Sequence, residues 1–474
     1  MTAKSTKGWV LALTSVASLI VALDALVVTT ALSTIRTDLG ASIEQLEWTV
    51  NAYNLSFAVL LLTAAALGDR FGRRRLFATG IGLFTAASAA CALAPDVGFL
   101  IAARAVQGAG AALVMPLSLA IVSAAFPPEK RGSAMGILMG VTGLAVASGP
   151  LVGGAIAQGL AWQWIFWVNV PLGVVTLPLI LTRLDESFGA DTGIDVGGVA
   201  LATLGALGLV WGLVRGNSAG WGSVEVMGAL VAGALLTIAF VAWELRAREP
   251  MLPMRLFRAR AFSAGNAASF LLTASLFGAV FFFAQFLQTG LGYGPLGTGL
   301  RMLPWTVTLS LCAPLAGALV DRIGARPFVI AGLFLQGAGM GWIALIAEPG
   351  LAYDRLIAPL VIAGCGVSMA IPAVQAAVVS SVTPQAIGKA AGVNSMMRQL
   401  GGVFGIAILV AVFAGAGGYA SAQAFSDGFA PAIGVSSGLA LLGALVATAL
   451  PGRRAAAAAP AMDPIPALEG GAGG

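Results

Sequence analysis

The sequence predicts an all-α membrane protein of two related helix bundles, and three observations lead to this fold class. Hydrophobic residues make up 58% of the 474 residues and charged residues only 9%, too few charges to cover a soluble fold of this length. The apolar runs last about twenty residues, the length of a membrane-spanning helix, whereas barrel strands alternate over about ten. A phrase also occurs twice, ALGDRFGRR at 66–74 and ALVDRIGAR at 318–326, which indicates a duplication.

About fourteen apolar runs are long enough to cross a bilayer, and charged residues or Pro and Gly separate them. They cover 9–31, 46–68, 76–94, 99–121, 135–157, 164–182, 194–214, 224–243, 262–287, 299–319, 326–347, 356–378, 390–414 and 430–450. The seventh and eighth runs are separated only by 215–223, so twelve spans is the alternative count.

The basic residues predict the topology. With a cytoplasmic N-terminus, most of the 25 Lys and Arg residues fall in inner segments, as positive-inside topology requires. The outer segments hold only Arg36, Arg215, Arg301 and Arg355. Merging the seventh and eighth spans would invert everything after them, so an even count with both termini cytoplasmic is preferred. The same bias accounts for the net charge of +5 without a nucleic-acid partner.

The two copies of the repeated phrase lie 252 residues apart, whereas six spans with short loops take roughly 190 to 200 residues. The surplus fits two inserted helices within 194–243. We therefore expect an N-terminal six-helix bundle at 1–182, the inserted pair and a cytoplasmic linker at 183–261, and a pseudo-symmetric C-terminal six-helix bundle at 262–451. The Ala-, Pro- and Gly-rich segment 452–474 is expected to be a disordered cytoplasmic tail.

Composition excludes several kinds of site. The three cysteines lie inside apolar runs, so no disulfide framework is expected. Histidine is absent, which removes the usual metal ligand and the usual near-neutral proton shuttle. The Gly-rich stretches 108–110 and 337–341 lie inside spans and not between a strand and a helix, so no nucleotide loop is expected. No cofactor and no ATPase module are predicted, and energy is expected to come from a proton gradient.

Five segments resemble the major facilitator superfamily, in particular its fourteen-span drug–proton antiporter branch. The segment 65–76 is similar to the signature between spans two and three, with Ala65 in place of its first glycine. RAVQGAGA at 104–111 and GLAVASGPLVGG at 143–154 resemble the motifs of spans four and five. WQWIFWVNVPLG at 162–173 resembles the opening of span six, and LDALVV at 23–28 places Asp24 where this branch carries an aspartate.

Three ionisable residues stand out within the predicted spans: Asp24, Arg104 and Arg398. A charge at a helix centre costs at least about 2.5–3.5 kcal/mol, so each needs a partner or a function. Asp24 is the only acid well inside a span. Arg104 and Gln107 share one helical face, and their depth in the membrane matches that of Asp24 within roughly one turn. We therefore predict a polar cluster of Asp24, Arg104 and Gln107 in the outward half of the N-terminal bundle. The alternative to proton coupling is a structural ion pair.

The resemblance implies roles for two further groups. The repeated loop motif is expected to be a conformational latch that stabilises one state of alternating access by bridging to acids of the opposite bundle. Its residues are Asp69, Arg70, Gly72, Arg73 and Arg74, with Asp321, Arg322, Gly324 and Arg326 as the weaker counterpart. The span-five residues Gly143, Gly149, Pro150, Gly153 and Gly154 are expected to form a kinked sliding seam between the halves. Plain topology and ordinary small-residue packing are the alternatives.

Aromatic and amide side chains supply candidates for a substrate cavity, because aromatic faces suit lipophilic cations and flat compounds. They are Tyr53, Asn54, Phe57, Asn266, Phe270, Gln285 and Gln288. Arg398 is expected to be a structural or gating residue of the second half. Lipid-facing packing is the alternative for each of the cavity candidates.

Together these features predict a multi-pass protein of the bacterial cytoplasmic (inner) membrane that works as a monomer. It is expected to export amphipathic small molecules in exchange for protons by alternating access. The nearer alternative is a proton-coupled transporter dedicated to one metabolite, such as an antibiotic, siderophore or lipid. Such a transporter could import or export its substrate. A membrane-bound enzyme would need a nucleophile–base pair or a metal cluster, which is not evident, and a sensor would bind a ligand without flux.

Overall fold

The computed structural model describes residues 3–189, 193, 195–247, 250–383 and 386–452, so most of the expected tail at 452–474 lies outside the described residues. Every regular element among them is helical. The N-terminal half comprises α1 (Ala3–Leu39), α2 (Ile43–Phe71), α3 (Arg73–Ala92), α4 (Val97–Ala125), α5 (Pro128–Gly159), α6 (Trp164–Trp167) and α7 (Asn169–Arg183). The inserted pair is α8 (Val196–Ala219) and α9 (Val224–Glu244).

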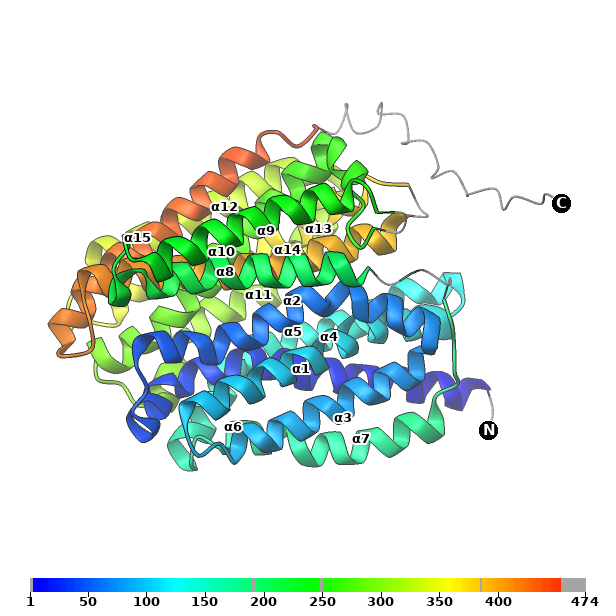
Figure 1. The fold of residues 1–474 in the computed structure, drawn as a ribbon, viewed down its shortest axis with the longest axis horizontal. Helices are drawn as coiled ribbons and strands as arrows, with labels where there is room; N and C mark the ends of the chain where they lie inside the picture. The colour runs from blue at the N-terminus through cyan, green and yellow to red at the C-terminus, as the bar shows by residue number, and fades with distance from the viewer. Residues whose placement is uncertain (1–2, 190–192, 194, 248–249, 384–385, 453–474) are drawn as a thin grey trace.

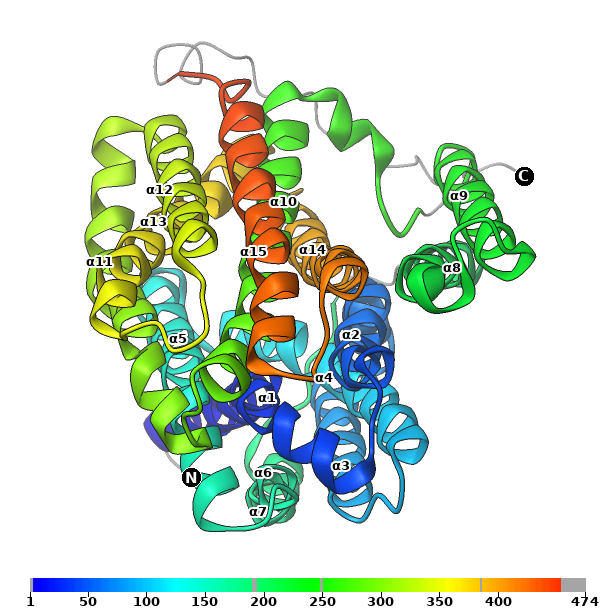
Figure 2. The same ribbon diagram turned by 90° about the vertical axis from the view of Figure 1, so that its left-hand side faces the viewer.

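The C-terminal half begins with the short helix η1 (Met254–Arg258) and continues with six long helices. They are α10 (Arg260–Gln285) with its π-helical extension η2 (Phe286–Gly290), α11 (Pro295–Ile323), α12 (Ala325–Ile346), α13 (Asp354–Val379), α14 (Ile387–Ala416) and α15 (Ala422–Ala447). The long helices run side by side (Figure 1), and viewed along their axes they form two groups, with α8 and α9 set to one side (Figure 2).

Among the described residues, twelve helices are long and apolar enough to cross a membrane, and α5 makes thirteen. The remaining long helix, α11, has 29 residues, which is also enough to span. The predicted fold class is therefore confirmed, including the inserted pair. α8 and α9 are two separate helices, so the hypothesis that they merge into one span is wrong.

The two copies of the loop motif have the same backbone geometry. Gly72 ends α2 with φ of 108°, and Gly324 ends α11 with φ of 100°. A side chain at such a φ is strained, so glycine is required where one span must stop and the next begin at once. The repetition in sequence is thus a repetition of one tight helix–helix corner.

Two seams join the halves: α2 packs against α14, and α5 packs against α11. α8 contacts both α2 and α14 beside the first seam. A cluster of buried aliphatic side chains, including Val59, Val210 and Val403, fills the space among these three helices. The inserted pair therefore covers one inter-half seam.

Close packing inside the second half depends on small residues, and Gly339 on α12 gives a test. A Cβ at this position would lie 2.6 Å from the carbonyl oxygen of Pro359 on α13. We expect Gly339→Ala to destabilise the protein by about 1–3 kcal/mol, measured as a lower Tm in detergent. Gly438→Ala on α15, where nothing lies within 4 Å, is the control and should not lower Tm, because alanine favours the helix over glycine.

Candidate functional site

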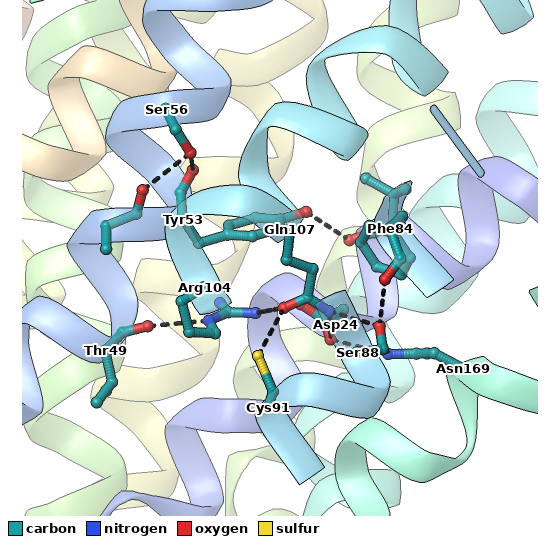
Figure 3. Close-up of polar contacts among 12 residues, drawn as sticks. Asp24, Thr49, Tyr53, Ser56, Phe84, Ser88, Cys91, Arg104, Gln107 and Asn169 are labelled. Atoms are coloured by element: carbon teal, nitrogen blue, oxygen red, sulfur yellow. Dashed lines mark hydrogen bonds and ion pairs between the residues drawn. The ribbon is translucent and has the colours of Figure 1, made fainter. Parts of the chain in front are cut away.

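Four helices of the N-terminal half converge on the carboxylate of Asp24, midway along α1. Its Oδ2 lies 2.5 Å from Nη1 of Arg104 on α4. Its Oδ1 accepts hydrogen bonds from Nε2 of Gln107, also on α4, and from Nδ2 of Asn169 on α7, each at 2.9 Å. Ser88 on α3 accepts a further bond from Gln107 at 2.9 Å. Figure 3 shows these side chains pointing toward one another.

The guanidinium of Arg104 is fixed from several sides. Its Nε donates to the carbonyl oxygen of Thr49 at 2.9 Å, and its Nη1 also donates to Oε1 of Gln107 at 2.7 Å. The Tyr53 ring lies 4.3 Å below it, at cation–π distance. The remaining nitrogen, Nη2, has no hydrogen-bond partner among the described residues, so its two N–H groups are open donors.

The cluster is shielded from solvent: Asp24 is 2% exposed, and Arg104 and Gln107 are fully buried. Opposite charges in a low-dielectric interior interact far more strongly than in water, and each charge without its partner would be costly. The site is therefore sensitive to any event that removes one of the two charges, such as protonation of the carboxylate.

The predicted cluster of Asp24, Arg104 and Gln107 is confirmed as a geometric unit. Sequence reasoning missed Asn169 and Ser88, which complete it. Asn169 lies within the 162–173 motif, whose match gave a signal for it. Ser88 carries no such signal, since a serine in an apolar helix usually bonds to its own backbone, as Ser88 also does to Phe84.

Asp24 is not the only buried acid, which corrects the sequence prediction. Glu47 in α2 is also fully buried, and its Oε1 accepts a hydrogen bond from Nδ2 of Asn51 at 2.8 Å. It was missed because it lies near the start of the predicted span 46–68, where an acid is normally expected to reach the interface.

The first copy of the loop motif contacts its own half. Arg73 pairs with Asp69 at 2.7 Å. Glu186, which follows α7, accepts from the backbone N–H of Arg74 at 2.8 Å and lies within ion-pair distance of Arg74 and Arg75. In this structure Glu186, which follows α7, is thus the acid partner of Arg74 and Arg75. In the second copy, Arg326 follows Gly324 in the first turn of α12.

The span-five residues divide between two contacts. Gly149 and Gly153 face α1, where a Cβ would press on Leu26 and Val27 respectively. Gly154 faces the opposite half at Pro295, and in return Gly299 of α11 packs against the backbone of Pro150. α5 bends by 41° between Ser133–Ala145 and Ser148–Gly159, where Pro150 removes a backbone donor. Gly143 has no neighbour within 4 Å of a Cβ and takes no part in this packing.

The seven cavity candidates lie in three different settings. Tyr53, Asn54 and Phe57 are buried in the N-terminal half, and the Tyr53 and Phe57 rings touch at 6.1 Å. Asn266 accepts a hydrogen bond from Asn394 at 3.3 Å, and Phe270 lies 6.0 Å from Phe404, within the C-terminal half.

Gln285 and Gln288 lie near the end of the molecule at which α1 ends and α2 begins, here called the distal end. Gln285 accepts a hydrogen bond from the Tyr419 hydroxyl. Gln288 of η2 accepts from Ser33 and donates to the carbonyl oxygen of Thr30 at 2.9 Å, which ties the two halves together. Arg398 on α14 is half-buried, and its Nε has no hydrogen-bond partner among the described residues.

The charge balance at Asp24 gives a stability prediction. Arg104→Leu leaves a buried carboxylate without its cation, so we expect a loss of about 3–5 kcal/mol, measured by unfolding in detergent at neutral pH. The double variant Asp24→Leu/Arg104→Leu removes both charges and should recover part of that loss. Equal loss in the single and double variants would contradict coupling between the two side chains.

Comparisons with known proteins agree with this architecture. The family model described as Major Facilitator Superfamily matches residues 14–406 and 265–464. The chain is 33% identical over 450 residues to the tetracenomycin C resistance and export protein of Streptomyces glaucescens, covering 93% of this chain and 83% of that protein. It is 35% identical over 394 residues to the multidrug resistance protein Stp of Mycobacterium tuberculosis, covering 83% and 73%.

A third relative is the cephamycin export protein CmcT of Amycolatopsis lactamdurans, 35% identical over 414 residues, with 86% of this chain and 85% of that protein covered. Among solved structures, the peptide transporter POT in complex with sulfate has a TM-score of 0.70 at 16% identity, covering 93% of this chain and 94% of that one, a likeness of fold alone. The chain therefore belongs to the Major Facilitator Superfamily, whose members are transporters and not enzymes.

Proposed function

We propose that the chain exports amphipathic small molecules in exchange for protons by alternating access. The observation that carries this proposal is the fully enclosed Asp24–Arg104 pair, the buried acid–base contact at the centre of the N-terminal half. A proton on Asp24 cancels the charge that holds Arg104, and so changes the free energy of the closed cluster. A substrate bound in the opposite conformation then competes with the proton through the equilibrium between the two states.

Contacts at the distal end support a state that is closed there. Besides Gln288, Arg36 of α1 stacks on the Tyr419 ring at 4.2 Å, and the backbone N–H of Leu296 donates to Gln158 at 3.0 Å. Burial raises the pKa of Tyr419, so its hydroxyl stays protonated and donates to Gln285. With both termini cytoplasmic in a bacterial inner membrane, this is a conformation closed to the outside.

The loop motif fits the role of a conformational latch in this cycle. Asp69 accepts from the Gly189 backbone N–H at 2.9 Å through its carbonyl oxygen, and Glu186 holds the start of α3. These bonds belong to the state described here. We propose that the arginines exchange Glu186 for contacts with the opposite half when the cytoplasmic side closes.

The relatives favour two ranges of substrate. One relative is named for multidrug resistance, whereas others are named for a single compound, tetracenomycin C or cephamycin. A dedicated exporter of one antibiotic-like metabolite is therefore the second candidate. In both cases the transporter works as a monomer, with the proton gradient as its energy source and no cofactor.

Gradient-driven flux tests the proposal. We expect Asp24→Asn in proteoliposomes to lose proton-driven transport of a lipophilic fluorescent cation while retaining dye binding, because the amide cannot take up a proton. Asp427→Asn, at an exposed acid of α15 bonded only to Gln423 among the described residues, is the control and should transport normally.

Equal flux from Asp24→Asn and the native protein would remove Asp24 as the proton carrier. If the native protein moves no dye under any gradient, the substrate range is narrow, and the test is repeated with tetracenomycin C and cephamycin.

A further inference from the structure

A second carboxyl lies at the seam between the halves, away from the Asp24 cluster. Glu47 is fully buried, as is Asn51 one turn later on α2. Nδ2 of Asn51 donates to Oε1 of Glu47 at 2.8 Å and also lies 3.3 Å from the carbonyl oxygen of Val403 on α14. One side chain thus connects the Glu47 carboxyl to the opposite half of the transporter.

The inserted helix α8 shields this carboxyl from the lipid side of the seam. Trp211 of α8 packs against Trp48, the neighbour of Glu47, with ring centroids 6.0 Å apart. Near the distal end, Arg215 of α8 pairs with Glu44 of α2 at 3.2 Å. Asn217, two residues on, donates to the carbonyl oxygen of Ala411 on α14. α8 is therefore bound to both α2 and α14 and covers the seam beside Glu47.

The cations on α1, α4, α8 and α14, which pack against α2, are engaged elsewhere or form no described contact with Glu47. Arg36 of α1 stacks on the Tyr419 ring. Arg215 is committed to Glu44 and to Glu225 of α9. Arg104 on α4 is committed to Asp24 and to the carbonyl oxygen of Thr49. On α14, the charges are Lys389 and Arg398, which precede Val403 by one turn or more, and no described ion pair joins either to Glu47. Glu44, the nearest charge on α2 itself, is an acid.

Two acceptor atoms at this site lack a donor. Neither Oε2 of Glu47 nor Oδ1 of Asn51 has a hydrogen-bond partner among the described residues. A buried carboxylate with no cation is very costly, whereas a neutral acid is not. Protonation turns Oε2 into a donor, and an acid and an amide already joined by one hydrogen bond can then close a ring of two. A single proton therefore satisfies a site that is otherwise two donors short.

We propose that Glu47 is a proton-binding residue of the distal gate: the α2–α14 seam closes around its neutral acid, and opening lets the acid release its proton to water on the distal side. The proton moves between Oε2 and that water, and no other bond changes. An acidic distal side therefore favours closure. The proton that Glu47 releases returns to the distal side from which it came, so Glu47 moves no proton across the membrane. Glu47 controls opening and closing of the distal gate, and Asp24 remains the proposed proton carrier.

This inference rests on the proposed alternating access but not on Asp24. The test is the distance between spin labels on Thr37→Cys of α1 and Ala420→Cys of the α14–α15 loop, both exposed at the distal end, in nanodiscs. Cys91, Cys312 and Cys365 are replaced by serine or alanine, and Asp24→Asn removes the other acid. Between about pH 5.5 and pH 8.5, we expect the closed fraction to fall by about twofold or more.

Glu47→Gln, which carries the missing donor at every pH, should keep the gate closed with no pH dependence. Glu47→Leu removes the titratable group but leaves the Asn51 amide only the Val403 carbonyl oxygen, so its gate should also show no pH dependence, with a smaller closed fraction than that of Glu47→Gln. Asp427→Asn, at an exposed carboxyl of α15 whose described hydrogen bond is to Gln423, should retain the native response. The proposal is overturned if the Glu47→Gln variant opens with rising pH as the labelled parent protein does. It is also overturned if the labelled parent protein, with Glu47 intact, does not respond to pH.

Because the distance needs no transport, its result is separable from the flux result for Asp24. A pH-sensitive gate with no proton-driven flux would leave Glu47 as a gate residue and reject proton coupling at Asp24. Proton-driven flux with a pH-insensitive gate would do the reverse.

Discussion

The buried contact between Asp24 and Arg104 is the constraint on which the N-terminal half depends. Two charges removed from water must be compensated within the bundle, because lipid offers no alternative partner. The structure meets this demand with donors to Asp24 from two helices, α4 and α7, and with the Ser88 hydroxyl of α3 one bond further out. α1, α4 and α7 are thereby fixed at one depth, so the ion pair is a structural element of the N-terminal half whatever its part in transport.

The described contacts inside the second half are of a different kind. Its interior is joined by neutral contacts, such as Ser275 with Ser436 and the stacked rings of Phe286 and Phe429, 4.2 Å apart. Neutral bonds and ring stacking do not change with protonation. Under the proposed function, this asymmetry in charge between two halves of similar architecture is the reason for seeking the proton-binding group in the first half.

Much of the fold followed from hydropathy and from the repeated phrase, because spans, corners and duplication are local properties of the chain. The Asp24 cluster was also predictable, since two residues three apart on one helix and an acid at matching depth leave few geometries. The neutral partners of Asp24 were harder to predict. Asn169 is one residue among many in the 162–173 motif, and Ser88 resembles any serine that bonds to the backbone of its own helix. Glu186 was missed as the partner of the loop motif because nothing local indicates which end of a later helix returns to Arg74.

Glu47 illustrates the same limit at a seam. Its burial is produced by α14 and α8, which are distant in sequence, so its position near the start of α2 suggested an interfacial acid. For a related reason, the sequence could not show whether the cavity candidates on α2 line a cavity or pack inside their own half. Composition marks Tyr53 and Phe57 as aromatic, but only helix packing decides that they face the interior of their own half.

The position of α8 has a mechanical consequence. Its last turns are bound to one half through Arg215 and to the other through Asn217, so rigid-body rotation of the halves cannot preserve both bonds. In the proposed cycle one of the two contacts therefore breaks, and the solvent-exposed ion pair of Arg215 is the weaker candidate because water and salt screen it. If the halves rotate as proposed, the inserted pair stays bound to one half and slides against the other.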